Sequence, residues 1–306
     1  MEVWILVVAV IISQLSISAS MPEAVINPHD FNYIIKNKDY CGKEPIDIFI
    51  WVHSGPANVR RRIALRETWA NPAMMPPGVK SKMIFFLGAI NNSSTQSLVE
   101  FEHQHYGDIV QEDYLDSYRN LTYKAMSGLK WLNRYCKNVK LILKCDDDMV
   151  ILMDKLFNHL KSVTGFPLKP VVNTIICDVW SKRPVERAGG MKWTVSEEEY
   201  SANKYPTYCP GLALLMSPDL VKVLWEKSLN TKYFWVDDVF FTGLLMKHLN
   251  VTWVQIGSLF HFGGETLSKT FSKAPGDFIF AHVFSYRTDL FYYLWRTVFP
   301  SQDFIY

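Results

Sequence analysis

Residues 140–153, KLILKCDDDMVILM, place Asp146, Asp147 and Asp148 between two apolar runs. The run before the aspartates has the continuous apolar pattern of a buried strand in a parallel sheet. In an extended segment Asp146 and Asp148 would point to one side and Asp147 to the other. Two such carboxylates could converge on a hard divalent cation, which would offset their repulsion. A solvated acidic turn is the alternative, but the flanking apolar residues favour a site.

The rest of the chain alternates between short apolar runs and helical patterns, which predicts one mixed α/β domain with helices covering a sheet. Ligands bind such sheets at the carboxyl ends of their strands, where the three aspartates fall. The predicted strands, besides the one before the aspartates, are 46–54, 82–89, 108–114, 170–177, 211–216 and 251–257. The predicted helices are 60–70, 120–136, 217–229 and 236–249.

The overall composition excludes some classes of protein. With 306 residues, 49% of them hydrophobic and 14% aromatic, the chain can bury a large core. Its 32 basic and 30 acidic residues nearly cancel, so no electrostatic argument favours nucleic acid as a partner. Function must therefore depend on a local site.

The N-terminus predicts entry into the secretory pathway. An apolar run at 3–12, followed by small residues, is typical of a signal segment, and residues 1–20 fit either an uncleaved anchor or a cleaved signal peptide. Residues 21–45 lack periodicity and are interpreted as a stem, which places the domain at 46–306. Glycosylation sequons at Asn92, Asn120 and Asn250 agree with a lumenal location. Five cysteines allow at most two disulfides, whose pairing stays open.

Two further features are candidates for the site. Asp237 and Asp238 begin a predicted helix, where carboxylates are commonly found because they compensate the helix dipole. The same position keeps an aspartate ionised, as a general base requires. His261 follows a predicted strand and precedes two glycines, although a histidine between phenylalanines is more often a core residue.

Six motifs, in order, resemble those of the inverting β-1,3-glycosyltransferases, the family of the β-1,3-galactosyltransferases and β-1,3-N-acetylglucosaminyltransferases. Residues 53–69, HSGPANVRRRIALRETW, resemble the family block S-x(3)-N-x(2)-RR-x(2)-IR-x-TW, with Leu65 in place of Ile. The other five are FFLG, YGDIVQEDYLDSYRNLTYKAMSGLKW, KCDDDMV, KYPTYCPGLALLMS and VDDVFFTG.

The resemblance implies a GT-A fold with a mixed central sheet and a Rossmann-like half that holds a UDP-sugar. It also implies Mn²⁺ bridging the diphosphate, with Asp148 as the main ligand and His261 as a further one. Asp146 and Asp147 would hold the water shell of the metal, the donor sugar or the ribose, and Asp146 is a candidate ligand itself. Carboxylate oxygens with one imidazole suit Mn²⁺.

The same resemblance makes Asp238 the catalytic base, because the E-D-V motif of the family matches Asp237, Asp238 and Val239 with Asp in place of Glu. Arg62 and Arg66 would bind the nucleotide or, equally, form a structural ion pair supporting the first helix.

The expected reaction transfers a hexose, galactose first or an N-acetylhexosamine, to the 3-hydroxyl of a glycan on a glycoprotein or glycolipid. The expected location is the Golgi membrane, with a single N-terminal span and a lumenal domain. Two alternatives stay open: a catalytically silent sugar-binding relative, and a different metal-dependent lumenal enzyme such as a hydrolase. Against a hydrolase, the sequence has no G-x-S-x-G nucleophile motif.

Overall fold

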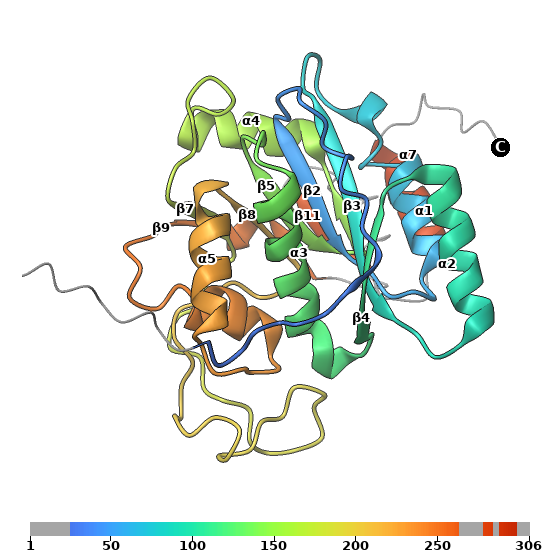
Figure 1. The fold of residues 1–306 in the computed structure, drawn as a ribbon. Helices are drawn as coiled ribbons and strands as arrows, with labels where there is room; N and C mark the ends of the chain where they lie inside the picture. Colours follow the sequence, from blue (N-terminus) through green and yellow to red (C-terminus); the bar gives the residue numbers. More distant parts are fainter. Residues whose placement is uncertain (1–24, 263–277, 284–287, 299–306) are drawn as a thin grey trace, which may run out of the picture.

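The computed structural model of the protein describes residues 25–262, 278–283 and 288–298. A central eight-stranded sheet carries helices on both faces (Figure 1), which confirms the mixed α/β architecture. Its strand order is β1-β4-β3-β2-β5-β8-β7-β9. These strands are β1 (Tyr33–Ile35), β2 (Ile48–His53), β3 (Ser81–Ala89), β4 (Ile109–Leu115), β5 (Ile142–Asp146), β7 (Thr174–Cys177), β8 (Ala213–Met216) and β9 (Thr252–Gln255).

The helices divide between the two faces of this sheet. One core cluster lies under α1 (Val59–Glu67), α2 (Ser93–Tyr106), α4 (Met153–Thr164) and α7 (Thr288–Val298). The other lies under α3 (Leu121–Tyr135), α5 (Asp219–Leu229) and the π-helical segment η3 (Val239–Leu244). All six residues of β2 are buried, which explains its continuous apolar sequence: helices cover it on both sides.

The strand directions place the aspartates at a functional edge. β5 pairs in parallel with β2, and Asp146 is the partner of His53 in that register. β3 and β4 continue the parallel arrangement on one side, whereas β8 pairs with β5 in the antiparallel direction on the other. The carboxyl ends of β2 and β5 therefore lie together, as predicted for a ligand-binding edge.

A second, three-stranded sheet begins directly after the aspartates. β6 (Met149–Ile151) pairs antiparallel with β11 (Phe280–His282), which pairs in parallel with β10 (Phe260–His261). The backbone N–H of Val283 donates to the carbonyl of Asp148 at 2.8 Å. This pairing brings the C-terminal part of the chain to the aspartates.

The N-terminal segment differs from expectation. The sequence predicts a stem at 21–45, yet β1 forms the edge of the main sheet and Cys41 forms a disulfide with Cys136. The buried His29 also places its Nε2 2.9 Å from a carboxylate oxygen of Glu112 on β4. A three-residue edge strand is too short to give a periodic pattern, so these long-range contacts left no signal in the local sequence.

The second disulfide joins Cys177 to Cys209, and Cys145 is a buried free thiol. The expected signal segment at 1–20 lies outside the described residues. Within the described part of the chain, no helix is long and apolar enough to cross a membrane.

Candidate active site

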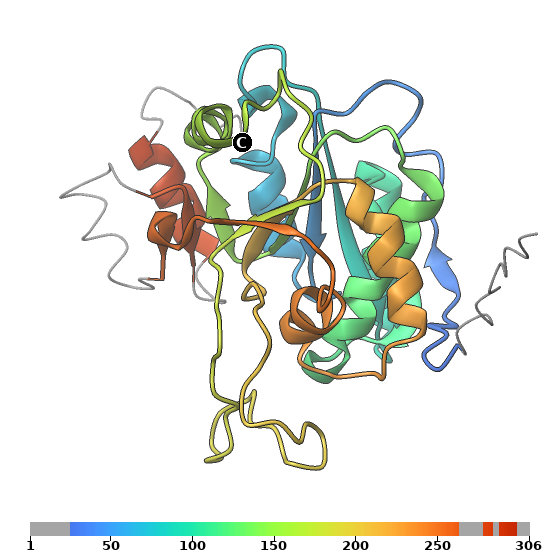
Figure 2. The same cartoon turned by 90° about the vertical axis from the view of Figure 1, so that its left-hand side faces the viewer.

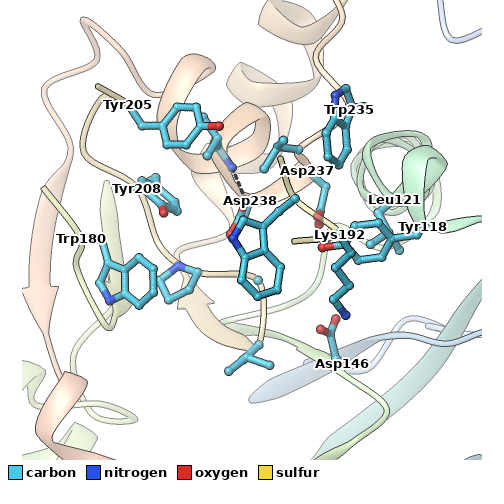
Figure 3. A pocket seen from close by; sticks show the side chains of 16 residues that line it. Tyr118, Leu121, Asp146, Trp180, Lys192, Tyr205, Tyr208, Trp235, Asp237 and Asp238 are labelled. Atoms are coloured by element: carbon cyan, nitrogen blue, oxygen red, sulfur yellow. Dashed lines mark hydrogen bonds between the residues drawn. The ribbon is translucent and has the colours of Figure 1, made fainter. Parts of the chain in front are cut away.

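A cavity of about 340 Å³ lies at the carboxyl end of β5 (Figure 3). Three carboxylates line it: Asp146, Asp237 and Asp238. One wall comes from the long connection between β7 and β8, residues 178–212, which projects from the body of the protein (Figure 2). The cavity is rich in aromatic side chains, namely Tyr118, Trp180, Trp193, Tyr205, Tyr208 and Trp235. Aromatic rings beside a few polar groups are typical of pockets for small polar ligands.

Asp238 lies where the chain enters η3. Its Oδ1 accepts a hydrogen bond from the backbone N–H of Val239 at 2.7 Å, which fixes the carboxyl at the start of the helix as predicted. Burial, followed by the neighbouring charge of Asp237, raises the pKa of Asp238 to about 7. Burial therefore outweighs the stabilising N–H, and the carboxyl exchanges a proton near neutral pH. This property suits a general base.

Asp146 ends β5 and faces the same cavity. Burial raises the pKa of Asp146 well above its usual range, while the ammonium of Lys144 opposes this shift. Lys144 is fully buried two residues earlier on β5, and its Nζ donates to the carbonyl of Gly211 at 3.5 Å. Burial also raises the pKa of Asp237, again opposed by Lys144. Lys144 is thus a buried positive charge shared by this group of carboxylates.

Asp147 is turned away from the cavity. Its Oδ2 accepts from Ser54 Oγ at 2.6 Å and from Asn58 Nδ2 at 2.9 Å, and its Oδ1 accepts from a guanidinium nitrogen of Arg61 at 2.6 Å. The carboxyl of Asp147 therefore ties the end of β5 to the junction between β2 and α1. Arg61 lies in the same basic run as Arg62 but is not among the residues that the sequence predicts for the site.

Asp148 has a different environment from the other two. Its Oδ2 lies 3.4 Å from Nε2 of His282 and 3.7 Å from a guanidinium nitrogen of Arg61. Its Oδ1 is buried without a hydrogen-bond partner. A buried carboxylate oxygen without a donor is costly unless another group binds it, so Asp148 fits a metal ligand. The extended conformation, in which side chains would alternate between two sides, ends at Asp146, because Asp147 and Asp148 form a turn before β6.

The histidine beside Asp148 is His282, not His261. His261 pairs with Ala281 across β10 and β11, and its ring lies 5.8 Å from that of Phe278. Because neighbouring residues of a strand point to opposite faces, His261 and His282 lie on opposite faces of the small sheet. Among the described residues, no three His, Cys, Asp or Glu side chains are grouped as a metal site. The structure therefore does not bring His261 together with Asp146 and Asp148.

Arg62 and Arg66 form structural ion pairs, which is the second of the two roles predicted for them. The buried Arg62 donates from Nε and NH2 to the carboxylate of Glu102 at 2.9 and 2.6 Å. Arg66 forms a two-pronged pair with Asp108, both bonds at 2.8 Å, and stacks over Tyr106 at 3.9 Å. Both guanidinium groups hold α1 to its neighbours, and the contacts give no support to nucleotide binding by either residue.

The sheet edge, the buried proton acceptor and the aromatic pocket together suit an enzyme that acts on small polar molecules such as sugars. Residues 60–256 match the family model described as galactosyltransferase, so the chain belongs to the galactosyltransferase family. It is a glycosyltransferase with the α/β architecture and mixed sheet expected of a GT-A fold.

Several known proteins are similar to the chain. It is 30% identical over 246 residues to beta-1,3-galactosyltransferase 5 of Homo sapiens, covering 78% of this chain and 75% of that protein. It is 29% identical over 226 residues to beta-1,3-galactosyltransferase 1 of Mus musculus, covering 74% of this chain and 68% of that protein. The solved galactosyltransferase LgtC, in complex with donor and acceptor sugar analogs, aligns with a TM-score of 0.41 at 13% identity, covering 84% of this chain and 97% of that chain.

Proposed function

We propose that this glycosyltransferase moves a hexose, galactose first, from a UDP-sugar to the 3-hydroxyl of an acceptor glycan with inversion at the anomeric carbon. The observation that carries the proposal is the carboxyl of Asp238, which faces the pocket with a pKa of about 7. The similarity to two beta-1,3-galactosyltransferases supports the choice of sugar and linkage.

Asp238 would act on the acceptor. In the pocket its ionised carboxylate accepts the proton of the attacking hydroxyl while that oxygen forms a bond to the anomeric carbon. The bond from the anomeric carbon to the diphosphate breaks in the same displacement, and UDP leaves with the electron pair. Asp146, at the floor of the same pocket, is placed to bind hydroxyls of the donor sugar. No covalent intermediate with the protein is required.

Asp148 and His282 are the residues that would hold Mn²⁺, with water completing the shell. The partnerless Oδ1 of Asp148 and the neighbouring imidazole form a donor set that suits this ion. When bound, Mn²⁺ supplies positive charge that stabilises the departing diphosphate. Asp147 does not take part directly, because its oxygens are occupied by Ser54, Asn58 and Arg61.

The site of action that we propose is the Golgi lumen, with the N-terminal segment as the membrane anchor and a glycoprotein or glycolipid as the acceptor. The two disulfides and the three sequons support a secretory compartment. The segment at 1–20 lies outside the described residues.

A donor screen tests the proposal. UDP release would be measured with UDP-galactose, UDP-N-acetylglucosamine and UDP-N-acetylgalactosamine, each with and without Mn²⁺ and acceptor. We expect release only with metal and acceptor together, and loss of at least a hundredfold in Asp238→Asn. Asp39→Asn, in an exposed turn remote from the pocket, is the matched control.

Each outcome of the screen has a meaning. Binding of UDP-sugars without release of UDP would favour the silent sugar-binding relative. Release that does not need an acceptor would favour a hydrolase. Unchanged transfer by Asp238→Asn would remove the proposed mechanism.

A further inference from the structure

Two cations lie against aromatic side chains that line the pocket. The ammonium of Lys192 lies 4.8 Å from the centre of the Tyr118 ring, and the guanidinium of Arg183 lies 4.1 Å from that of Trp180. Lys192 lines the pocket, and Figure 3 shows its side chain pointing inward in the direction of Asp146, whereas Arg183 is not among the residues that line the pocket. Both cations belong to the connection between β7 and β8.

Lys192 and Arg183 differ in their ion pairing from Arg119, a third cation that contacts an aromatic side chain of the pocket. Arg119 stacks over Trp235 at 4.2 Å, but its guanidinium also pairs with Glu199 at 2.7 Å. Lys192 and Arg183 form no salt bridge with any residue that the structure describes. The aromatic rings hold these two side chains in place and leave their charge available to a ligand.

The position of the pocket indicates which substrate meets this charge. The pocket contains Asp238, the base that we assign to the acceptor hydroxyl, and Asp146, which we assign to the transferred sugar. Asp148 and His282, which we assign to the metal and hence to the diphosphate, do not line the pocket. This assignment rests on the proposed function. It implies that the aromatic side chains lining the pocket around Asp238 face the acceptor glycan.

We propose that Lys192 and Arg183 select acceptor glycans that carry an anionic group, a carboxylate or a sulfate, near the sugar that receives the hexose. The sugar ring lies against the aromatic wall while the anion meets Lys192, and Arg183 adds positive charge from its place against Trp180. The carboxylates of the pocket would repel such an acceptor in the absence of these cations, so the pair determines whether an acidic glycan enters.

Direct binding tests this proposal independently of catalysis. Calorimetry would give the Kd for methyl β-galactoside and its 6-sulfate, and for methyl β-glucoside and methyl β-glucuronide. We expect each charged sugar to bind about tenfold more tightly than its neutral partner, as a charged hydrogen bond contributes. The two pairs show whether sulfate or carboxylate is preferred. The preference should shrink as NaCl is raised.

Variants assign the effect to these residues. Lys192→Met should reduce the ratio of charged to neutral affinity severalfold, and Arg183→Met should reduce it by a smaller factor, because Arg183 contacts Trp180 without lining the pocket itself. Lys204→Met, an exposed lysine of the same connection that neither lines the pocket nor contacts an aromatic ring of it in the described residues, should leave the ratio unchanged. Equal affinity for charged and neutral sugars in the unmodified protein would overturn the proposal. So would loss of UDP binding in Lys192→Met with no change in that ratio, because Lys192 would then serve the donor.

Failure of the proposed function looks different. If no UDP-hexose is transferred to any acceptor but the charged sugars still bind more tightly through Lys192, the transferase mechanism is wrong and the anion preference holds. If hexose is transferred and neutral acceptors bind as tightly as acidic ones, only the inference about Lys192 and Arg183 is wrong.

Discussion

Nε2 of His282 lies 3.4 Å from Oδ2 of Asp148, although the two residues come from distant parts of the chain. The pairing of β6 with β11 produces this proximity, because it places His282 opposite Met149, the residue after Asp148. The metal site that we propose would therefore be formed by the small second sheet and the end of β5 together.

The first prediction concerns metal affinity. His282→Ala should weaken Mn²⁺ binding at least tenfold, measured by calorimetry in the presence of UDP, because it removes a nitrogen donor beside Asp148. His261→Ala is the matched control, since its side chain lies on the opposite face of the small sheet. The reverse ranking of the two variants would restore His261 as the ligand.

The second prediction concerns the pH dependence of the reaction. Asp238, as the base that we propose, would act only when ionised, so kcat/KM should rise with pH through about 7 and level off above it. Asp237→Asn removes the neighbouring negative charge that raises the pKa of Asp238. That variant should shift the rise in kcat/KM to lower pH. A profile unaffected by Asp237→Asn would argue against coupling between the two carboxyls.

The third prediction concerns stability. The pKa of Asp238 rises from 3.8 to about 7 on folding, so the folded state binds more protons between these values and the free energy of unfolding falls as pH rises through this window. Asp238→Asn should therefore stabilise the protein at pH 8, by about 2 kcal/mol after allowance for solvent screening. At pH 4 the variant and the unmodified protein should have the same free energy of unfolding. Urea unfolding at pH 4 and pH 8 would show whether the variant is the more stable only at the higher pH.

The fourth prediction separates structure from binding at α1. Arg62→Ala should lower the free energy of unfolding by about 3 kcal/mol, because it removes one of the two guanidinium partners of the buried carboxylate of Glu102 and leaves only Arg66. Arg60→Ala, at an exposed position of the same helix, should change it little. Folded Arg62→Ala at low temperature should bind UDP with unchanged affinity. Loss of UDP binding without loss of stability would return Arg62 to the nucleotide site.

Much of the main sheet is predictable because its strands are long, buried and continuously apolar. β2 and β5 show this most clearly, and their parallel pairing places Asp146 at the expected edge. Asp238 is likewise predictable, since its role at the start of a helix follows from local sequence and the motif around it.

The parts that sequence analysis missed depend on contacts between distant residues. β1 and β11 are three-residue strands, too short for a periodic pattern, so neither the edge of the sheet nor His282 could be inferred. Arg61 and Arg62 are adjacent in one basic run. Only the orientation of α1 directs Arg61 to Asp147 and Arg62 to Glu102.

The stereochemistry of the product tests the central claim most directly. The protein would be incubated with UDP-galactose, Mn²⁺ and an acceptor glycan, and the new linkage determined by proton NMR. The α-linked donor should give a β-linked galactose on the 3-hydroxyl, and Asp238→Asn should give none. An α-linked product, or β-linked product formed equally by Asp238→Asn, would contradict single displacement with Asp238 as the base.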